Sequence, residues 1–512
     1  MSGEIVDLSQ GQAPPQIETD ICIVGSGSGG ATAARVLAEA GRDVVVLEEG
    51  SDFPASRMTQ RDGEMYAALY MERGSRATTD LGVTVLQGRV LGGGGVINAS
   101  DVVPIPAGVL AHWRKHFGLS EFTEAALGPY QARALQDLRA NPILPEQMNR
   151  ANGLLRQGAE RLGIAGNLMQ HNRVGCAGLG TCLIGCPIDA KKNPRLVAIP
   201  KALAAGARFF TRARARRVLY AESELKRVDV QILDTRGLRA IGSTSVRART
   251  VIVAANAVGS AELLLRSGIG NQHVGRHLIL QPQLPIVAVF PERVEAFRGI
   301  PQSYAVTEFE REDDPEHGLW GYRIEGIMGT PGMVGSLLPF SGVEGKVAMA
   351  EYDHLAASLL LVPDEPSGAV RVSDTGRLRI EYRQHDNHKE RIREAARTAA
   401  RIYFAAGASR VVVPVSPPVV LTHPDQIDSL STLPLRPAGA PLLSAHQQGS
   451  ARMAPRARDG ALAPNGHVYG TRGVYVFDSS GFPSSASTHT MAPIMALARY
   501  WSAQLLQHTP PS

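Results

Sequence analysis

The stretch Asp20–Gly50 reads DICIVGSGSGGATAARVLAEAGRDVVVLEEG. These residue types predict a buried strand, a tight glycine turn, an amphipathic helix and a second buried strand that ends in an acid. Gly25 suits the turn, Gly27 lets the backbone approach a pyrophosphate, and Gly30 lets the helix pack on the strand. Glu48 lies where an acid can hold a ribose hydroxyl. The stretch predicts a dinucleotide-binding fold; the alternative is an ordinary glycine-rich loop in an α/β core.

Length and composition limit the remaining possibilities. The 512 residues are 44% apolar and 20% charged, which suits a globular protein of two or three domains. The net charge is +5, but basic residues are mixed with acids, so we expect no nucleic-acid partner. The basic run 212–217 alternates with alanine and is interpreted as the exposed face of a strand. With no leader pattern at residues 1–18 and no apolar run of about 18 residues, we expect a cytoplasmic protein without a membrane span.

A second glycine-rich segment, 88–99, reads GRVLGGGGVINA. Four consecutive glycines suit neither helix nor strand, so they indicate close backbone approach to a flat ligand, or else a plain loop. The segment resembles the first signature of the glucose–methanol–choline (GMC) flavin oxidoreductases. Segment 251–270, VIVAANAVGSAELLLRSGIG, resembles the second. Segments 444–453 and 476–493, SAHQQGSARM and VFDSSGFPSSASTHTMAP, resemble the C-terminal signatures.

The resemblance implies two interleaved domains. One is an α/β, Rossmann-like FAD-binding domain of the GMC type, built from residues 1–110, 165–282 and 430–512. The other is an α+β substrate domain on an antiparallel sheet, built from residues 111–164 and 283–429. Within its longer segment, strands are predicted at 284–290, 347–349, 359–362, 369–372 and 378–382, with a helix at 387–405.

The resemblance also implies the FAD contacts. They are Gly25, Gly27, Ser28, Gly30, Glu48, Arg89, Gly92, Gly93, Gly94, Asn98, Ala215, Asp478 and Met491. Asp478 also suits the N-cap of a following helix. Ile97 occupies the position of the histidine that binds flavin covalently in some family branches, so we predict non-covalent FAD. Asn256 replaces a usual glycine, and asparagine tolerates positive φ better than most residues.

Two histidines are the predicted catalytic residues. Oxidation of an alcohol removes a hydroxyl proton and a hydride, and a neutral imidazole is suited to take the proton near pH 7. The resemblance implies His446 as this base and His489 as the hydrogen-bonding partner of the substrate oxygen. The hydride would go to flavin N5. The alternative for either residue is an ordinary core or surface histidine.

Three of the four cysteines lie within eleven residues, as Cys176, Cys182 and Cys186. With Pro187 they match three of the four cysteine positions in the ferredoxin pattern C-x2-C-x2-C-x3-C-P, and Leu179 occupies the second position. The spacing resembles FAD glucose dehydrogenases of the GMC family, in which such a loop holds a [3Fe–4S] cluster. It also resembles long-chain alcohol oxidases, for which a cluster is not implied. A structural thiol loop is the alternative to a cluster.

The function implied is an FAD-dependent dehydrogenase or oxidase acting on the CH–OH group of an alcohol. Segment 326–339 is rich in Gly, Met, Leu and Pro, which favours an apolar or alicyclic alcohol over a sugar. Electrons would pass to an acceptor protein or to O₂. The alternatives are a GMC-fold lyase or decarboxylase without net redox, and a binding protein that has lost its cofactor. An NAD-only dehydrogenase would leave the C-terminal histidine segments unexplained.

Overall fold

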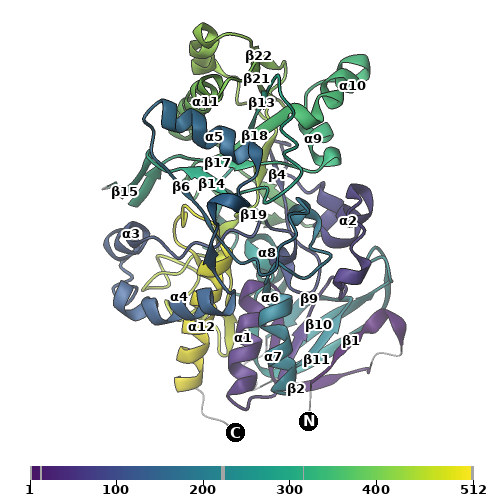
Figure 1. Ribbon diagram of the computed structural model, residues 1–512. Helices are drawn as coiled ribbons and strands as arrows, with labels where there is room; N and C mark the ends of the chain where they lie inside the picture. Colours follow the sequence, from purple (N-terminus) through teal and green to yellow (C-terminus); the bar gives the residue numbers. More distant parts are fainter. Residues whose placement is uncertain (1–2, 12–13, 221–224, 315, 317, 509–512) are drawn as a thin grey trace.

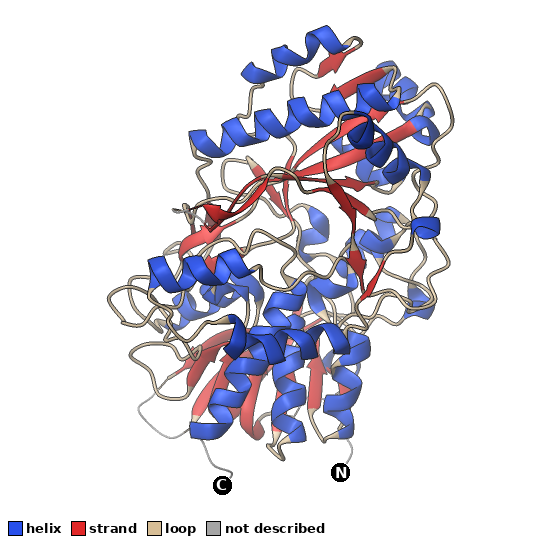
Figure 2. Ribbon diagram, turned by 60° about the vertical axis from the view of Figure 1, so that its left-hand side comes forward, coloured by secondary structure: helices blue, strands red, loops and turns tan. Residues whose placement is uncertain are grey.

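The computed structural model describes residues 3–11, 14–220, 225–314, 316 and 318–508. It shows two sheets stacked one above the other, each covered by helices (Figures 1 and 2). The lower sheet lies near both chain ends, and the upper sheet lies beneath two long helices. This mixed α/β architecture, with a Rossmann-like part and an antiparallel part, confirms the predicted fold class.

The lower sheet has eight strands in the order β1-β8-β3-β2-β11-β10-β9, and β25 also pairs with β11. The pairings from β1 through β11, and of β25 with β11, are parallel, while β10 is antiparallel to both neighbours. β3 is buried along its whole length, as expected for a parallel strand covered on both faces. The bounds are β1 Ile5–Asp7, β2 Ile17–Val24, β3 Val44–Leu47, β8 Arg208–Thr211, β9 Ala213–Leu219, β10 Lys226–Leu233, β11 Ala240–Val253 and β25 Val474–Val476.

The helix of the opening stretch is α1, Ser28–Glu39, and it packs against α7 and α12 on the lower sheet (Figure 1). These two helices span Ile199–Ala204 and Met491–His508. Eight of the twelve residues of α1 are Gly, Ala, Val or Leu, and most of the helix is buried. These small or apolar side chains allow α1 to pack closely on its neighbours. Close helix packing therefore brings the C-terminal segment beside the dinucleotide motif.

The upper sheet is antiparallel and has seven strands in the order β22-β21-β13-β18-β17-β14-β6. Helices α5 and α11 pack behind it, and the apolar face of α11 is buried there. The bounds are β6 Gly166–Leu168, β13 Leu284–Val289, β14 Tyr304–Val306, β17 Arg323–Ile327, β18 Leu355–Leu361, β21 Arg410–Val413, β22 Val419–Leu421, α5 Arg150–Arg161 and α11 Asp386–Ala406.

Small sheets join distant parts of the chain. One has the order β20-β19-β12-β24, and two-stranded sheets pair β23 with β4, β5 with β7, and β15 with β16. The bounds are β4 Val83–Val85, β5 Asn141–Pro142, β7 Gln170–His171, β12 Arg276–Ile279, β15 Glu310–Asp314, β16 Gly318–Gly321, β19 Gly368–Val372, β20 Leu378–Glu381, β23 Leu442–Ser444 and β24 Gln448–Ser450. The other helices are α2 Asp62–Leu69, α3 Ala107–Phe117, α4 Glu124–Asp137, α6 Pro194–Val197, α8 Asn256–Ser267, α9 Pro331–Leu337 and α10 Gly342–Ala350.

Two local predictions are wrong. Residues 347–349 are not a strand but the end of α10, because Glu344 and Lys346 continue a helix-forming run without a turn signal. Residues 212–217 do lie at and within strand β9, but only Arg217 among them is exposed. Of the other arginines in that run, Arg212 is buried and Arg214 and Arg216 are half-buried.

Two elements lie away from the domain predicted for them, although the domain boundaries themselves stay a prediction. β6 pairs with β14 of the upper sheet, and α4 packs on α12 beside the lower sheet. β6 is only three residues long, so its own sequence does not predict its partner strand. The path of the chain through the fold decides which strand it pairs with. Within the described part of the chain, every helix is too short or too polar to span a bilayer.

Candidate functional site

A cavity of about 610 Å³ is bounded by residues from both sheets. Both predicted catalytic histidines and most predicted FAD contacts line it, namely Gly25, Gly27, Ser28, Glu48, Arg89, Gly93, Gly94, Asn98, Ala215, Asp478 and Met491. Of the predicted contacts, Gly30 and Gly92 do not line the cavity. The structure therefore brings together at one cavity segments that are more than 400 residues apart in the chain.

The turn before α1 requires its glycines. Gly25 has φ +101°, and a Cβ there would lie 2.3 Å from the carbonyl oxygen of Ala254. A Cβ on Gly30 would lie 1.9 Å from the oxygen of Gly25, so Gly30 acts behind the cavity wall by allowing helix and strand to pack. α1 begins after Gly27, which provides no side-chain cap. Its first N–H groups are therefore available to an anion in the cavity.

The two glycine-rich loops contact each other. Gly93 has φ +59°, and a Cβ there would lie 2.7 Å from the Cα of Gly27. The N–H of Gly92 donates to Ser26 Oγ at 3.1 Å, which joins the same two loops behind the wall. A Cβ on Gly94 would meet no atom within 4 Å. The loops therefore form a backbone-lined cradle that an added side chain would fill, which suits a flat dinucleotide cofactor such as FAD.

Glu48 is buried at the end of β3. Its Oε2 accepts hydrogen bonds from the backbone N–H of Ser26 at 3.1 Å and from Ser26 Oγ at 2.5 Å. Its Oε1 accepts from the N–H of Gly50 at 2.7 Å. Burial raises the pKa of Glu48, against the lowering effect of these bonds. The carboxylate is thus oriented at the cavity wall with lone pairs left for a ligand hydroxyl.

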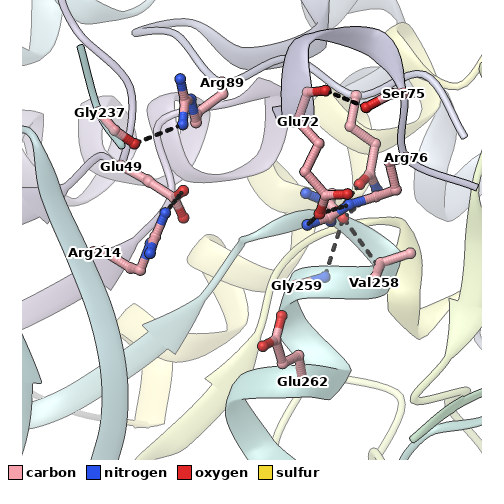
Figure 3. Close-up of polar contacts among 12 residues, drawn as sticks. Glu49, Glu72, Ser75, Arg76, Arg89, Arg214, Gly237, Val258, Gly259 and Glu262 are labelled. Atoms are coloured by element: carbon pink, nitrogen blue, oxygen red, sulfur yellow. Dashed lines mark hydrogen bonds and ion pairs between the residues drawn. The ribbon is translucent and has the colours of Figure 1, made fainter. Parts of the chain in front are cut away.

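Two arginines that the sequence interpretation placed on an exposed strand face, Arg214 and Arg216, line this cavity, and Figure 3 shows Arg214 beside Glu49. Arg214 of β9 pairs with Glu49 at 2.8 Å, and Arg89 donates to the carbonyl oxygen of Gly237 at 2.9 Å. Arg216 also lines the cavity, and burial lowers its pKa. The alternation of arginine with alanine was the signal that could have placed these arginines together, because a strand sends alternate side chains to one face.

Two predicted backbone features are present at the cavity. Asp478 accepts from Ser480 N–H at 2.9 Å and so caps the short helix Ser479–Gly481, while its other oxygen accepts from Ser260 Oγ at 2.5 Å. Asn256 has φ +68°, which confirms that asparagine occupies a left-handed position here. Its Oδ1 accepts from the N–H of Gly259 at 3.1 Å, so the side chain also caps α8.

The two predicted catalytic imidazoles are neighbours. The ring centroids of His446 and His489 lie 4.9 Å apart with the planes at 85°. His446 Nδ1 lies 2.7 Å from Gln281 Oε1 and 3.2 Å from Gln283 Nε2. Donation from Nδ1–H to Gln281 leaves Nε2 as the proton acceptor, a tautomer assigned from these hydrogen bonds. Burial and the neighbouring His489 lower the pKa of His446 to about 3, so this imidazole is neutral at pH 7.

His489 is paired with a carboxylate that sequence reasoning missed. Its Nε2 lies 3.0 Å from Oε1 of Glu325, which is buried in β17. Burial alone would raise the pKa of Glu325, but the charges of His489 and Arg323 lower it to about 2. Burial alone would lower the pKa of His489, but Glu325 raises it. The available signal was an acid at the centre of a short strand, residues 323–327, between Ile324 and Gly326.

The cysteine loop lies at a separate small pocket. Cys176, Cys182 and Cys186 all line this pocket, with Cys176 exposed and the other two half-buried. Arg173 Nη2 lies 3.6 Å from Cys182 Sγ. Among the described residues, no three His, Cys, Asp or Glu side chains converge as metal ligands. The described residues therefore show no site for a metal ion here, and the [3Fe–4S] cluster stays a prediction.

Comparison with known proteins places the chain in a family. Two models described as GMC oxidoreductase match residues 66–283 and 364–498, and a NAD(P)-binding Rossmann-like model matches residues 23–85. An uncharacterized GMC-type oxidoreductase of Mycobacterium tuberculosis is 34% identical over 503 residues, which are 97% of this chain and 77% of that protein. The chain belongs to the GMC oxidoreductase family. Membership implies FAD as the cofactor of this GMC oxidoreductase.

More distant relatives of this GMC oxidoreductase include a long-chain-alcohol oxidase of Arabidopsis thaliana. It is 28% identical over 519 residues, which are 96% of this chain and 68% of the oxidase. Among solved structures, pyridoxine 4-oxidase from Mesorbium loti matches 96% of this chain and 100% of its own, with TM-score 0.71 and 18% identity. A formate oxidase matches 97% of this chain and 99% of its own chain, with TM-score 0.72 and 16% identity. At these identities the two structures show the fold alone.

Proposed function

We propose that this GMC oxidoreductase oxidises the CH–OH group of an apolar or alicyclic alcohol, with FAD held non-covalently. The observation that carries the proposal is the pair of imidazoles, His446 and His489, at one polar region of a cavity that also has apolar wall residues. Among the apolar residues are Ile327, Met333, Leu359, Leu378 and Leu443. Such a wall suits a hydrocarbon frame, and the imidazoles suit its hydroxyl. The Arabidopsis relative is a long-chain-alcohol oxidase, which supports the same substrate class.

The two histidines would have different roles because their environments differ. Neutral His446 offers Nε2 to the hydroxyl proton of the substrate, and Gln281 holds the ring in that tautomer. Glu325 at Nε2 raises the pKa of His489, and in its protonated form His489 would donate from Nδ1–H to the substrate oxygen as negative charge develops there. Bound FAD supplies the hydride acceptor. The electrons would leave to O₂ or to an acceptor protein.

The cavity also suits FAD itself. The cradle of Gly27 and Gly93 admits a flat ligand, Glu48 and the N-terminus of α1 lie where a ribose and a pyrophosphate are held, and Arg214 adds positive charge nearby. Ile97 also lines the cavity and offers no atom for a covalent flavin link.

A visible spectrum of the purified protein, before and after anaerobic incubation with alcohols, tests the proposal. A flavin spectrum that bleaches with an apolar or alicyclic alcohol is the expected result, and repetition in air shows whether O₂ restores the colour. Bleaching by sugars alone would reject the substrate class. A bound flavin that no alcohol bleaches would reject alcohol oxidation.

A further inference from the structure

The cavity wall contains a carboxylate that the roles above do not use. Asp101 lines the cavity and is only 3% exposed. Within the described part of the chain, neither of its oxygens has a hydrogen-bond partner. Burial of a polar group without a hydrogen bond is costly, so proteins rarely keep one without a reason. The position at the substrate cavity suggests that a ligand supplies the missing donor.

The charges around Asp101 limit what that donor can be. The groups that act on it electrostatically are His489, Arg173 and Arg323, which are cationic, and Glu325, which is anionic. Burial raises the pKa of Asp101 to about 7, with Glu325 adding to the rise and the cationic groups opposing it. Because positive charge already exceeds negative charge here, an ammonium group of a ligand would be repelled. A neutral hydroxyl can donate to the carboxylate without that penalty.

We propose that Asp101 is a specificity residue that accepts a hydrogen bond from a second hydroxyl of the substrate. The substrate is then a diol, or a more highly hydroxylated compound, on an apolar or alicyclic frame. One hydroxyl lies at His446 and His489 and is oxidised, and the other lies at Asp101. This inference rests on the proposed function and narrows its substrate class.

The size of the expected effect follows from the burial of Asp101. A buried carboxyl group left without a hydrogen-bond partner discriminates against the ligand that lacks the donor. A hydrogen bond to such a group corresponds to roughly 10-fold in kcat/KM. We therefore expect at least one diol to exceed its mono-alcohol analogue by about that factor.

The experiment compares cyclohexanol with the cis and trans isomers of 1,2-, 1,3- and 1,4-cyclohexanediol, using the FAD-loaded full chain. The readout is the ratio of kcat/KM for the best diol to that for cyclohexanol. We expect Asp101→Ala to bring this ratio close to one. The matched control is Ser100→Ala, since Ser100 Oγ is also buried without a partner in the same loop but does not line the cavity. This control should keep the ratio of the unchanged protein.

A second readout needs no turnover. The best-binding diol should raise the melting temperature of the FAD-loaded protein more than cyclohexanol does, and Asp101→Ala should remove the difference while Ser100→Ala keeps it. If no alcohol bleaches the flavin but this binding difference is present, alcohol oxidation fails and the Asp101 assignment stands. A ratio near one for every diol in the unchanged protein, or a preference that survives in Asp101→Ala, would overturn the assignment. Asp101→Leu provides a second variant of similar shape without a hydrogen-bond acceptor if the alanine variant does not fold.

Discussion

Nε2 of His489 lies 3.0 Å from Oε1 of Glu325, a carboxylate with no exposed surface. The same carboxylate is also held by Arg323 at 2.9 Å and by the amide of Gln302. The pair joins the C-terminal segment to β17 of the upper sheet, 164 residues earlier in the chain. It therefore connects the two parts of the molecule at the place where the substrate would lie.

Glu325→Gln should change the pH profile of flavin reduction. The carboxylate raises the pKa of His489, so its removal should let the imidazole lose its proton at lower pH. We expect the alkaline limb of the anaerobic reduction rate to move to lower pH, with a loss of roughly 10-fold at pH 8. Stopped-flow absorbance across pH measures this. Glu381→Gln, a change at a surface ion pair outside the cavity, should leave the limb in place, and an unmoved limb in Glu325→Gln would contradict the assignment.

The pair should also stabilise the fold over a defined pH range. His489 has a raised pKa, so its contribution is fully present below 6.5 and is lost as pH rises through the raised value. Glu325 has a pKa lowered from 4.5 to about 2, so its contribution is present above 4.5 and is lost as pH falls toward 2. The free energies of unfolding of the parent and of Glu325→Gln, measured in urea, should differ most between these two pH limits, by roughly 3 kcal/mol. If the difference in unfolding free energy does not depend on pH, the ion pair of His489 and Glu325 is not its cause.

His446→Ala should slow flavin reduction while FAD stays bound. Loss of a general base costs about 100-fold to 10,000-fold in rate. Absorbance of the purified variant checks the flavin content, and anaerobic single-turnover reduction measures the rate. His467→Ala is the control, since that half-buried histidine does not line the cavity. A near-normal reduction rate in His446→Ala would remove this residue from the base role.

Gly94→Leu should exclude the cofactor without disturbing the fold. A Cβ on Gly94 would meet no protein atom within 4 Å and Gly94 lines the cavity, so a larger side chain has room only where the ligand would lie. We expect the flavin-to-protein ratio to fall roughly 10-fold. Gly63→Leu in α2, where a Cβ also meets nothing, is the control and should keep its flavin. Full flavin content in Gly94→Leu would place the cofactor elsewhere.

The cysteine loop can be tested by thiol reactivity. With free thiols as the structure has them, Cys176 should react first with a thiol reagent because it is exposed, Cys182 and Cys186 should follow, and buried Cys22 should react only after unfolding. Mass spectrometry of labelled peptides gives the order. Iron and acid-labile sulfide in stoichiometric amounts after anaerobic purification, with all three loop thiols protected, would instead establish the cluster.

Several features of this protein were predictable because they depend on short-range patterns. The turn glycines, the strand and helix of residues 20–39, and the N-cap at Asp478 follow from backbone sterics and local hydrogen bonding, which neighbouring residues largely decide. The long helix was predicted within a residue of each end of α11, because its apolar positions recur at helical spacing. The strand predicted at 347–349 failed because so short an apolar run fits either structure.

The sequence by itself determined the family, the glycine cradle and the two histidines, because their motifs carry their chemistry in consecutive residues. Only the tertiary structure decided that Glu325 and Asp101 line the same cavity as those histidines and that Gln281 contacts His446. These residues come from segments without a distinctive motif. The burial and charge that set the pKa values of Glu325 and Asp101 arise only when the sheets stack. Long-range packing is therefore what lowers the pKa of His446 and raises the pKa of His489.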